Sequence, residues 1–322
     1  MDQNKNTAVT VGIPTYNQAA YIKETIGGCL KQTYPSLQII VADDRSTDST
    51  ASIIRSFNDE RIEYKLNDTN MGRVANYRHI LYNYATTGWY VNLDGDDYFT
   101  DLDFIAHAME MISRYPADDI AFYQANHDME KLKKALPRFE ILSDEEIITD
   151  GKDYFLNFPR IRKFTHCATV YNRKKAMETD FYNFDCLFTD FQSVSRLSLT
   201  GKVILSSRKV AVWRQHGFNE SKSLNEQNFK KELASLEAIA RFASPLLDKT
   251  NINNWLRQMK DYYRLVFIYH NSTNAPGWKT LQFIFRHWRF NWLFPQYVLK
   301  NLIRMLGKKG EHKNDQVAEF ST

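Results

Sequence analysis

The sequence is poor in the residues that mark several common classes of protein. Its 322 residues include only three cysteines, Cys29, Cys167 and Cys186, which are far apart and lack the spacing of a metal site. Three dispersed cysteines do not form a disulfide framework, and they are typical of a reducing compartment. The start of the chain, residues 1–6, is polar and has no secretory signal. We therefore expect a cytoplasmic protein.

Long apolar runs, internal repeats and low-complexity tracts are also missing. Without about 20 consecutive apolar residues, a membrane-spanning helix is not expected. The hydrophobic content of 43% still leaves ample material for a core. The length allows one large domain with an appendage.

Acidic residues are absent between Asp261 and Glu311, where eight lysines and arginines occur. Residues 262–322 hold nine of the 42 basic and three of the 38 acidic residues, so residues 1–261 carry 33 and 35. The excess of basic residues therefore lies in residues 262–322, the C-terminal tail. Its segment 276–309 is also rich in tryptophan, as in helices that lie on an anionic membrane surface. The alternative is a helix packed on the rest of the protein; no module indicates nucleic-acid binding.

Apolar strand patterns alternate with helix patterns over the first 125 residues. The predicted strands are 8–13, closed by Pro14, then 37–42, 61–66, 89–93 and 120–125. The predicted helices are 19–31, a segment from a Ser46 or Thr47 cap to about Phe57, 73–85 and 101–115. This alternation predicts an α/β fold with a doubly wound, mostly parallel sheet covered by helices.

The second half is less regular. After a polar connection at 126–150 we predict a strand at 166–171, a helix at 190–199 ending near Gly201, and short strands at 203–206 and 210–213. Helical patterns follow at 229–242 and 252–269. The change of character places a domain boundary near residue 220, between a domain of residues 1–220 and a helical C-terminal region of residues 221–322.

Polar clusters follow three of the predicted strands, at 14–17, 43–46 and 94–97. Parallel sheets bind ligands outside the carboxyl ends of their strands, so three clusters on one edge favour a nucleotide crevice over ordinary loops. Asp94, Asp96 and Asp97 occupy four positions, and like charges this close are best tolerated around a cation. Hard oxygen ligands suit Mg²⁺ or Mn²⁺ with substrate phosphates. The alternative is an Asp-rich turn.

Taken in order, these motifs resemble the family 2 glycosyltransferases of the GT-A fold, which move a sugar from a nucleoside diphosphate to an acceptor with inversion. The resemblance runs from about Val9 to His216. The segments that carry it are Val11-Gly12-Ile13-Pro14-Thr15-Tyr16-Asn17, Val41-Ala42-Asp43-Asp44-Arg45-Ser46-Thr47-Asp48, Asn70-Met71-Gly72-Arg73 with Asn76, and Leu93-Asp94-Gly95-Asp96-Asp97.

The resemblance implies a donor site, with Asp44 toward the base and UDP preferred by analogy. It also implies that Asp96 and Asp97 hold Mn²⁺ or Mg²⁺. Arg45 stands where family members often have glycine. The implied donor-binding residues are Pro14, Thr15, Tyr16, Asn17, Asp44, Arg73, Asn76, Asp94, Asp96 and His216.

The family's general base lies in a Glu-Asp pair at the start of a helix, and the matching stretch is Phe188-Thr189-Asp190-Phe191. Thr189 replaces the usual Glu, so the resemblance implies Asp190 as the base, with Asp185 as the second candidate. The alternative makes Asp190 a helix N-cap. His166 and Tyr171 are candidates for the acceptor side.

We therefore expect a metal-dependent transferase that acts on a glycan or polyprenyl-linked acceptor, peripheral on the inner face of the membrane. Two other functions compete. A nucleotidyltransferase would share the sheet and the acidic site, but it requires a Gly-rich phosphate loop that residues 12–15 lack. A catalytically degenerate, nucleotide-binding scaffold at the membrane is the second alternative, because Thr189 stands where the family usually has Glu.

Overall fold

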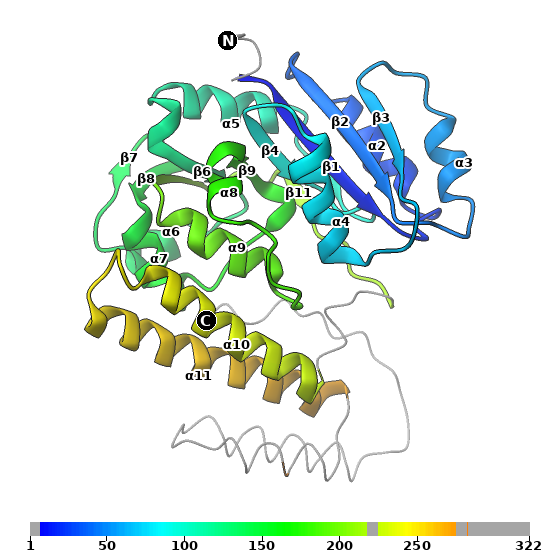
Figure 1. Cartoon of the computed structure of the whole chain (residues 1–322). Coiled ribbons are helices and arrows are strands. Elements are labelled where there is room, and N and C mark those ends of the chain that lie inside the picture. The colour runs from blue at the N-terminus through cyan, green and yellow to red at the C-terminus, as the bar shows by residue number, and fades with distance from the viewer. Residues whose placement is uncertain (1–6, 218–224, 275–281, 283–322) are drawn as a thin grey trace.

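A computed structural model describes residues 7–217, 225–274 and 282 of the chain. Its centre is a nine-stranded sheet in the order β3-β2-β1-β4-β9-β6-β10-β8-β7, seen in Figure 1. The strands are β1 Val9–Thr15, β2 Leu37–Asp43, β3 Ile62–Leu66, β4 Trp89–Asn92, β6 Ile120–Gln124, β7 Glu140–Ile141, β8 Glu146–Asp150, β9 Thr169–Asn172 and β10 Lys202–Ser206.

Two of these strands, β8 and β9, run against the other seven. The sheet is thus largely parallel, and the predicted fold class is confirmed. Strands β1 to β4 and β6 all point the same way, so their carboxyl ends lie along one edge. A small second sheet pairs β5 Tyr98–Phe99 with β11 Ala211–Val212.

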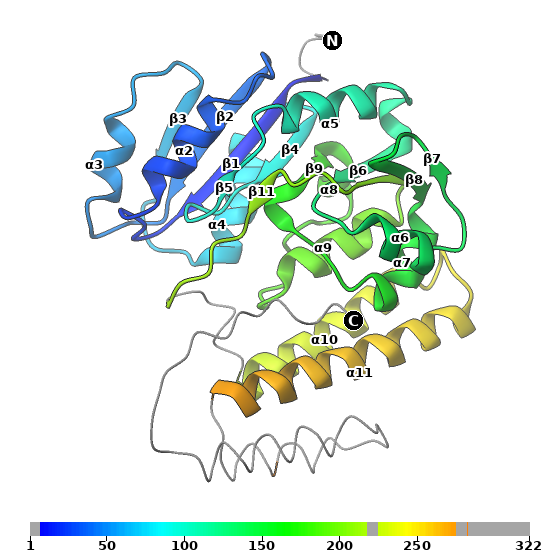
Figure 2. The same cartoon turned by 180° about the vertical axis from the view of Figure 1, so that it is seen from behind.

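Helices cover both faces of the sheet, as Figures 1 and 2 show from opposite sides. One face carries α2 Ile22–Leu30, α3 Thr50–Arg55 and α5 Phe104–Ser113. The other carries α4 Arg73–His79, continued by the π-helical turn η1 Ile80–Tyr84, and α7 Gly151–Ile161, α9 Thr189–Ser198, α10 Glu226–Ala243 and α11 Lys249–Asn274. Shorter elements are η2 Ala117–Asp119, α6 Met129–Ala135, η3 His166–Ala168 and α8 Arg173–Glu178.

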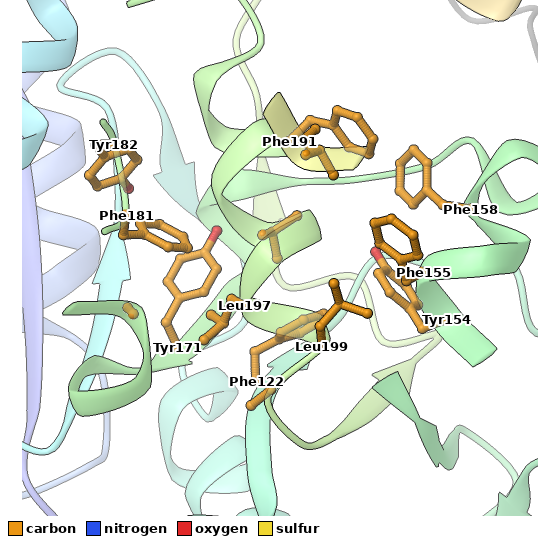
Figure 3. Packing of buried hydrophobic residues seen from close by; sticks show 14 of the residues in the cluster. Phe122, Tyr154, Phe155, Phe158, Tyr171, Phe181, Tyr182, Phe191, Leu197 and Leu199 are labelled. Carbon is orange, nitrogen blue, oxygen red and sulfur yellow. The ribbon is translucent and has the colours of Figure 1, made fainter. Parts of the chain in front are cut away.

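Alternation along the strands divides the core into two clusters. Ile39 and Val41 of β2 face α2 and α5, whereas Ile40 and Ala42 face the opposite layer. Figure 3 shows aromatic side chains of α7 and α9 meeting in that second layer, where the Phe158 and Phe191 ring centroids are 4.5 Å apart. Burying a side chain of this size contributes about 1.5–3 kcal/mol. This layer anchors α9, the helix that carries Asp190.

The prediction that Pro14 closes the first strand is wrong, because β1 continues through Pro14 to Thr15. Pro14 pairs with Ala42 of β2, but the β4 register ends at Gly12 opposite Asn92. Pro14 therefore lies beyond the last β1–β4 pair, where its lack of an N–H costs no hydrogen bond between strands. Its carbonyl still accepts from the Gly95 N–H.

The polar connection predicted at 126–150 is also partly wrong, since it contains α6, β7 and β8, and α7 follows it. Asp128 caps α6 by accepting from the Lys131 N–H, and Asp150 caps α7 by accepting from the Lys152 N–H. The sequence did not predict α7, because Pro159 lies inside this helix and proline is not expected in a helix interior.

Two smaller differences concern element ends. The segment 166–168 is the helical turn η3, and the strand begins only at Thr169. Helix α3 starts at Thr50, whose N–H is accepted by Asp48 Oδ1 at 2.9 Å, so neither Ser46 nor Thr47 caps it.

The hairpin of α10 and α11 packs under α7 and α9 in Figures 1 and 2. Trp255 of α11 is 1% exposed and stacks on Phe155 of α7 at 4.5 Å. The hairpin and the sheet layer therefore share one hydrophobic cluster. The boundary near residue 220 remains a prediction.

No helix within residues 7–217, 225–274 and 282 is both long and apolar enough to cross a bilayer. The membrane-surface hypothesis concerns segment 276–309, which lies outside the described residues apart from residue 282.

Candidate active site

The three polar clusters predicted to share one edge of the sheet lie against one another. The Asp44 N–H donates to the Thr15 carbonyl at 2.8 Å, and the Gly95 N–H donates to the Pro14 carbonyl at 3.1 Å. A Cβ on Gly95 would lie 2.8 Å from Thr15 Oγ1, which is closer than real Cβ atoms approach such an atom, so the loops need glycine there. Backbone hydrogen bonds thus join the ends of β1, β2 and β4.

Asp44 organises the loop that leads into α4. Its carboxylate, 3% exposed, accepts from the backbone N–H of Met71 at 2.9 Å and of Gly72 at 2.8 Å, and from Asn67 Nδ2 at 2.8 Å. Asn76 Nδ2 donates to the Ala42 carbonyl at 2.9 Å. The buried contacts of Asp44 and Asn76 therefore fix the loop that leads into α4, which begins at Arg73.

The turn after β2 has the conformation that glycine favours although it lacks glycine. Arg45 has a φ of 71°, in the left-handed region, and Asn17 has a φ of 52°. Asn17 Oδ1 accepts from the Thr47 N–H at 2.7 Å, which ties the two turns together. Tyr16, beside them, is 47% exposed, so its ring is open to a ligand.

The acidic loop contains three carboxylates in different surroundings. Asp94 Oδ1 accepts from the Tyr77 hydroxyl at 2.7 Å and from Asn92 Nδ2 at 3.0 Å. Burial and the charge of Asp96 raise the pKa of Asp94 to about 6. Burial and the charges of Asp94 and Asp96 also raise the pKa of Asp97. In this loop burial and mutual repulsion therefore disfavour the charged forms of Asp94 and Asp97, and a cation bound nearby would favour them.

Of the two predicted metal ligands, Asp96 and Asp97, Asp96 lies beside a histidine. Asp96 Oδ2 lies 2.7 Å from His216 Nε2, and His216 stacks on Tyr21 at 5.0 Å. Asp97 is 3% exposed, and its Oδ1 accepts from the Arg214 N–H at 2.9 Å. No set of three or more His, Cys, Asp or Glu side chains in the described ranges converges on a cation position. A carboxylate and an imidazole fit Mn²⁺ or Mg²⁺ when phosphate oxygens complete the shell.

Arg73 lies between this acidic loop and the turn that precedes α9. Its guanidinium donates to the carbonyls of Cys186 at 3.1 Å and Leu187 at 3.2 Å. Its positive charge lowers the pKa values of both Asp94 and Asp190, opposing the effect of burial on each. The guanidinium therefore lies where it acts on both carboxylates.

Asp190 lies in the first turn of α9 and is partly exposed. The N-cap position belongs to Phe188, so Asp190 does not cap this helix. Burial raises the pKa of Asp190, as suits a general base working near neutral pH. Thr189 is buried and donates to the Phe184 carbonyl at 2.8 Å. Asp185, the second candidate, has an 80% exposed side chain 3.0 Å from Lys231 Nζ.

His166 and Tyr171 belong to an aromatic cluster beside these residues. His166 Nδ1 lies 2.7 Å from the Tyr171 hydroxyl, and Nε2 lies 2.8 Å from the Tyr182 hydroxyl. The Tyr77 ring, whose hydroxyl binds Asp94, is 5.9 Å from the His166 ring. Burial and the charge of Arg73 lower the pKa of His166 to about 3. The imidazole is therefore neutral in the folded protein.

This neutral histidine makes stability depend on pH. The ordinary pKa of histidine is about 6.5, so between pH 6.5 and 3 the unfolded chain binds the proton and the folded one does not. The contribution of His166 to the free energy of unfolding is therefore fully present above about pH 7 and falls as the pH decreases. From pH 7 to pH 5 the contribution of His166 should fall by about 1–2 kcal/mol. Denaturant unfolding of wild type and His166→Gln at both pH values measures it.

The control for this prediction is His79→Gln, since His79 is partly exposed near the end of α4. His166→Gln should show a smaller stability loss on acidification than wild type, and His79→Gln should match wild type. Equal acid sensitivity of all three proteins would contradict a neutral, buried His166.

Two site residues were not predicted from the sequence. Tyr77 is four residues after Arg73, which places both on one helix face, and that spacing was a usable signal. Arg214 binds Asp97 through its N–H and donates from Nε to the Asp96 carbonyl at 2.7 Å. Its partners are more than 100 residues away, so no local pattern indicates this role.

Comparison with known proteins identifies related sequences. A family model described as Glycosyl transferase family 2 matches residues 10–179. An Escherichia coli protein described as a UDP-Glc:alpha-D-GlcNAc-diphosphoundecaprenol beta-1,3-glucosyltransferase is 33% identical over 122 residues, which cover 38% of this chain and 46% of that protein. The chain spans about half the length of the curated relatives that it matches.

Solved structures share the fold. S. aureus TarS 1–349 in complex with UDP-GlcNAc has a TM-score of 0.59 at 16% identity, over 91% of this chain and 79% of that one. The mannosyltransferase PcManGT from Pyrobaculum calidifontis, in complex with GDP-Man and Mn²⁺, has a TM-score of 0.59 at 15% identity, over 94% and 88%. At these identities the likeness concerns the fold alone.

Proposed function

The chain belongs to glycosyl transferase family 2, and from this premise we propose that it is an inverting transferase with Asp190 as its general base. The donor is a nucleoside-diphosphate sugar, and the acceptor is a hydroxyl of a glycan or a polyprenyl-linked glycan. The main support is the position of Arg73, which binds the turn before Asp190 and acts on the charges of Asp94 and Asp190.

The donor would lie along the joined loops of β1, β2 and β4. The open ring of Tyr16 offers a stacking surface for the base, next to the Thr15 and Asp44 backbone contact. Related folds hold UDP-GlcNAc in one case and GDP-Man in the other, so both are nucleoside-diphosphate sugars. We favour UDP, because the Escherichia coli relative is named for a UDP-sugar.

Asp96 and His216 would hold Mn²⁺ or Mg²⁺. Bound there, the ion supplies the positive charge that turns the diphosphate into an acceptable leaving group. The Oδ1 of Asp97 already accepts from the Arg214 N–H. Asp94, held by Tyr77, lies beside the pair and is suited to orient the ribose or the sugar.

In the proposed transfer step, Asp190 is the base. Asp190 accepts the proton of the acceptor hydroxyl while that oxygen bonds to the anomeric carbon. The bond from this carbon to the diphosphate oxygen breaks, and its electron pair leaves with the diphosphate. Attack opposite the leaving group inverts the anomeric centre. The cytoplasmic, membrane-peripheral location and the role of segment 276–309 remain predictions.

The direct test offers the full chain a panel of UDP- and GDP-sugars with Mn²⁺, Mg²⁺ or EDTA. We expect one UDP-sugar with a divalent ion to raise the unfolding temperature, because binding at 100 times Kd stabilises by about 2.7 kcal/mol. Release of free UDP in the presence of an acceptor glycan should depend on the ion. A rise in unfolding temperature without turnover of any donor would support the nucleotide-binding scaffold instead of the transferase. An unchanged unfolding temperature with every nucleotide sugar would contradict both the transferase and the scaffold.

A further inference from the structure

Glu232 is a charged residue buried in the middle of α10, outside the segment that matches the family model. Its side chain is 0% exposed, in the layer formed by α9, α10 and α11. Burying a carboxylate costs several kcal/mol unless hydrogen bonds compensate, so its partners show what it stabilises.

The partners are two backbone groups at the start of α9. Glu232 Oε1 accepts from the Leu187 N–H at 2.6 Å and from the Phe188 N–H at 3.3 Å. The first N–H groups of a helix lack partners within the helix, and negative charge is favourable there. Phe188 is the N-cap of α9, and Asp190 follows two residues later.

The opposite side of the same turn is held by Arg73, which donates to the Cys186 and Leu187 carbonyls. The turn 186–188 is thus clamped, with its N–H groups bound from α10 and its carbonyls bound from α4. Thr189 holds the same turn through the Phe184 carbonyl. Two distant residues, Arg73 and Glu232, and one local contact from Thr189 therefore fix the turn from which Asp190 follows.

We propose that Glu232 is a positioning residue for Asp190, and that the α10–α11 hairpin thereby forms part of the catalytic apparatus. This inference rests on the role of Asp190 in the proposed function. Glu232 does not touch the reacting atoms. It sets the place of the base by fixing the turn from which α9 begins.

The titratable groups whose charges act on Glu232, or on which its charge acts, are Asp190 of α9, Cys186 of the turn and Tyr263 of α11. Burial, with a contribution from Asp190, raises the pKa of Glu232 to about 7. Glutamine is therefore a close substitute, because its oxygen accepts from the same two N–H groups. Aspartate keeps the charge but is one methylene shorter.

The experiment compares Glu232→Gln, Glu232→Asp and the control Glu237→Asp, all in the full chain. Glu237 is on the same helix but exposed, paired with Lys260 at 2.8 Å. We expect Glu232→Asp to lower kcat by roughly 10- to 100-fold, because a displacement near 1 Å costs about 10²-fold. Its KM for the donor should stay within about twofold of wild type. Glu232→Gln and Glu237→Asp should keep kcat within about threefold.

Hydrogen exchange of the peptide spanning residues 184–192 provides a readout that needs no activity. Faster exchange at Leu187 and Phe188 in Glu232→Asp, with wild-type exchange in Glu232→Gln, would support the clamp. Equal kcat in Glu232→Asp and wild type, or equal losses in the Gln and Asp variants, would overturn the inference. If wild type turns over no donor, the proposed function fails, and the exchange data still decide whether Glu232 orders the turn.

Discussion

Asp190→Asn should lose sugar transfer by roughly 10²–10⁴-fold, the usual contribution of a general base. Asparagine has nearly the same shape as aspartate, so the first turn of α9 is kept. What it loses is the ability to accept a proton from the acceptor hydroxyl. Donor binding should be unchanged, because the predicted donor contacts come from the ends of β1 and β2, from α4, from the acidic loop and from His216, and none comes from α9. Steady-state kinetics with the donor found by screening, together with the donor dissociation constant, measure both quantities.

Asp185→Asn is the matched control, since Asp185 lies five residues earlier and was the second candidate for the base. Its side chain is 80% exposed and paired with Lys231. Exposed pairs contribute little, so this variant should keep near-wild-type kcat. The reverse pattern, with Asp185→Asn inactive and Asp190→Asn active, would transfer the role to Asp185. Activity lost in Asp190→Asn with donor affinity retained would exclude a scaffold that never performs transfer.

Asp96→Asn should show the second large effect, a loss of roughly 10³-fold in kcat/KM. The ion supplies several kcal/mol of charge stabilisation to the departing diphosphate, and each 1.36 kcal/mol is a factor of ten. An amide is a weaker ligand than a carboxylate, so the variant should also require more Mn²⁺ for half-maximal rate. Titration of Mn²⁺ in the activity assay separates the weaker ion binding from the lower maximal rate.

The control is Asp118→Asn, whose side chain is 80% exposed and pairs with Lys174 on the surface. It should behave as wild type in rate and in Mn²⁺ requirement. Thermal stabilisation by UDP with Mn²⁺ should be present in wild type and Asp118→Asn and lost in Asp96→Asn. Full activity of wild type in excess EDTA would refute a metal-dependent reaction.

Local patterns were sufficient to bring together the loops that follow β1, β2 and β4. Apolar runs such as residues 37–42 form strands because both faces of a parallel strand are buried, and each run ends in polar residues where the strand leaves the sheet. The ends of parallel strands meet at one edge, so the sequence alone predicts that Asp44, Asp94 and Asp96 lie near one another. The direct backbone bonds between the loops confirm that part of the prediction.

The surroundings of Asp190 were less predictable for a physical reason. Asp190 takes its position from a turn whose binding groups are Arg73, more than 110 residues earlier, and Glu232, more than 40 residues later. In the sequence, Glu232 looks like any glutamate on an amphipathic helix. Helix α7 was not predicted because Pro159 interrupts its pattern, although its aromatic residues pack beside Phe191 of α9 (Figure 3).

The sequence by itself determined the α/β class, because strands and helices follow from short segments with local periodicity. Its ordered motifs carried the resemblance to the family, and the family model confirms that resemblance. The tertiary structure alone decided which carboxylate pairs with His216, which one Arg214 binds through its backbone, and what holds Asp190 in place. Those contacts join side chains far apart along the chain, and only the packing of the core brings them within hydrogen-bonding distance.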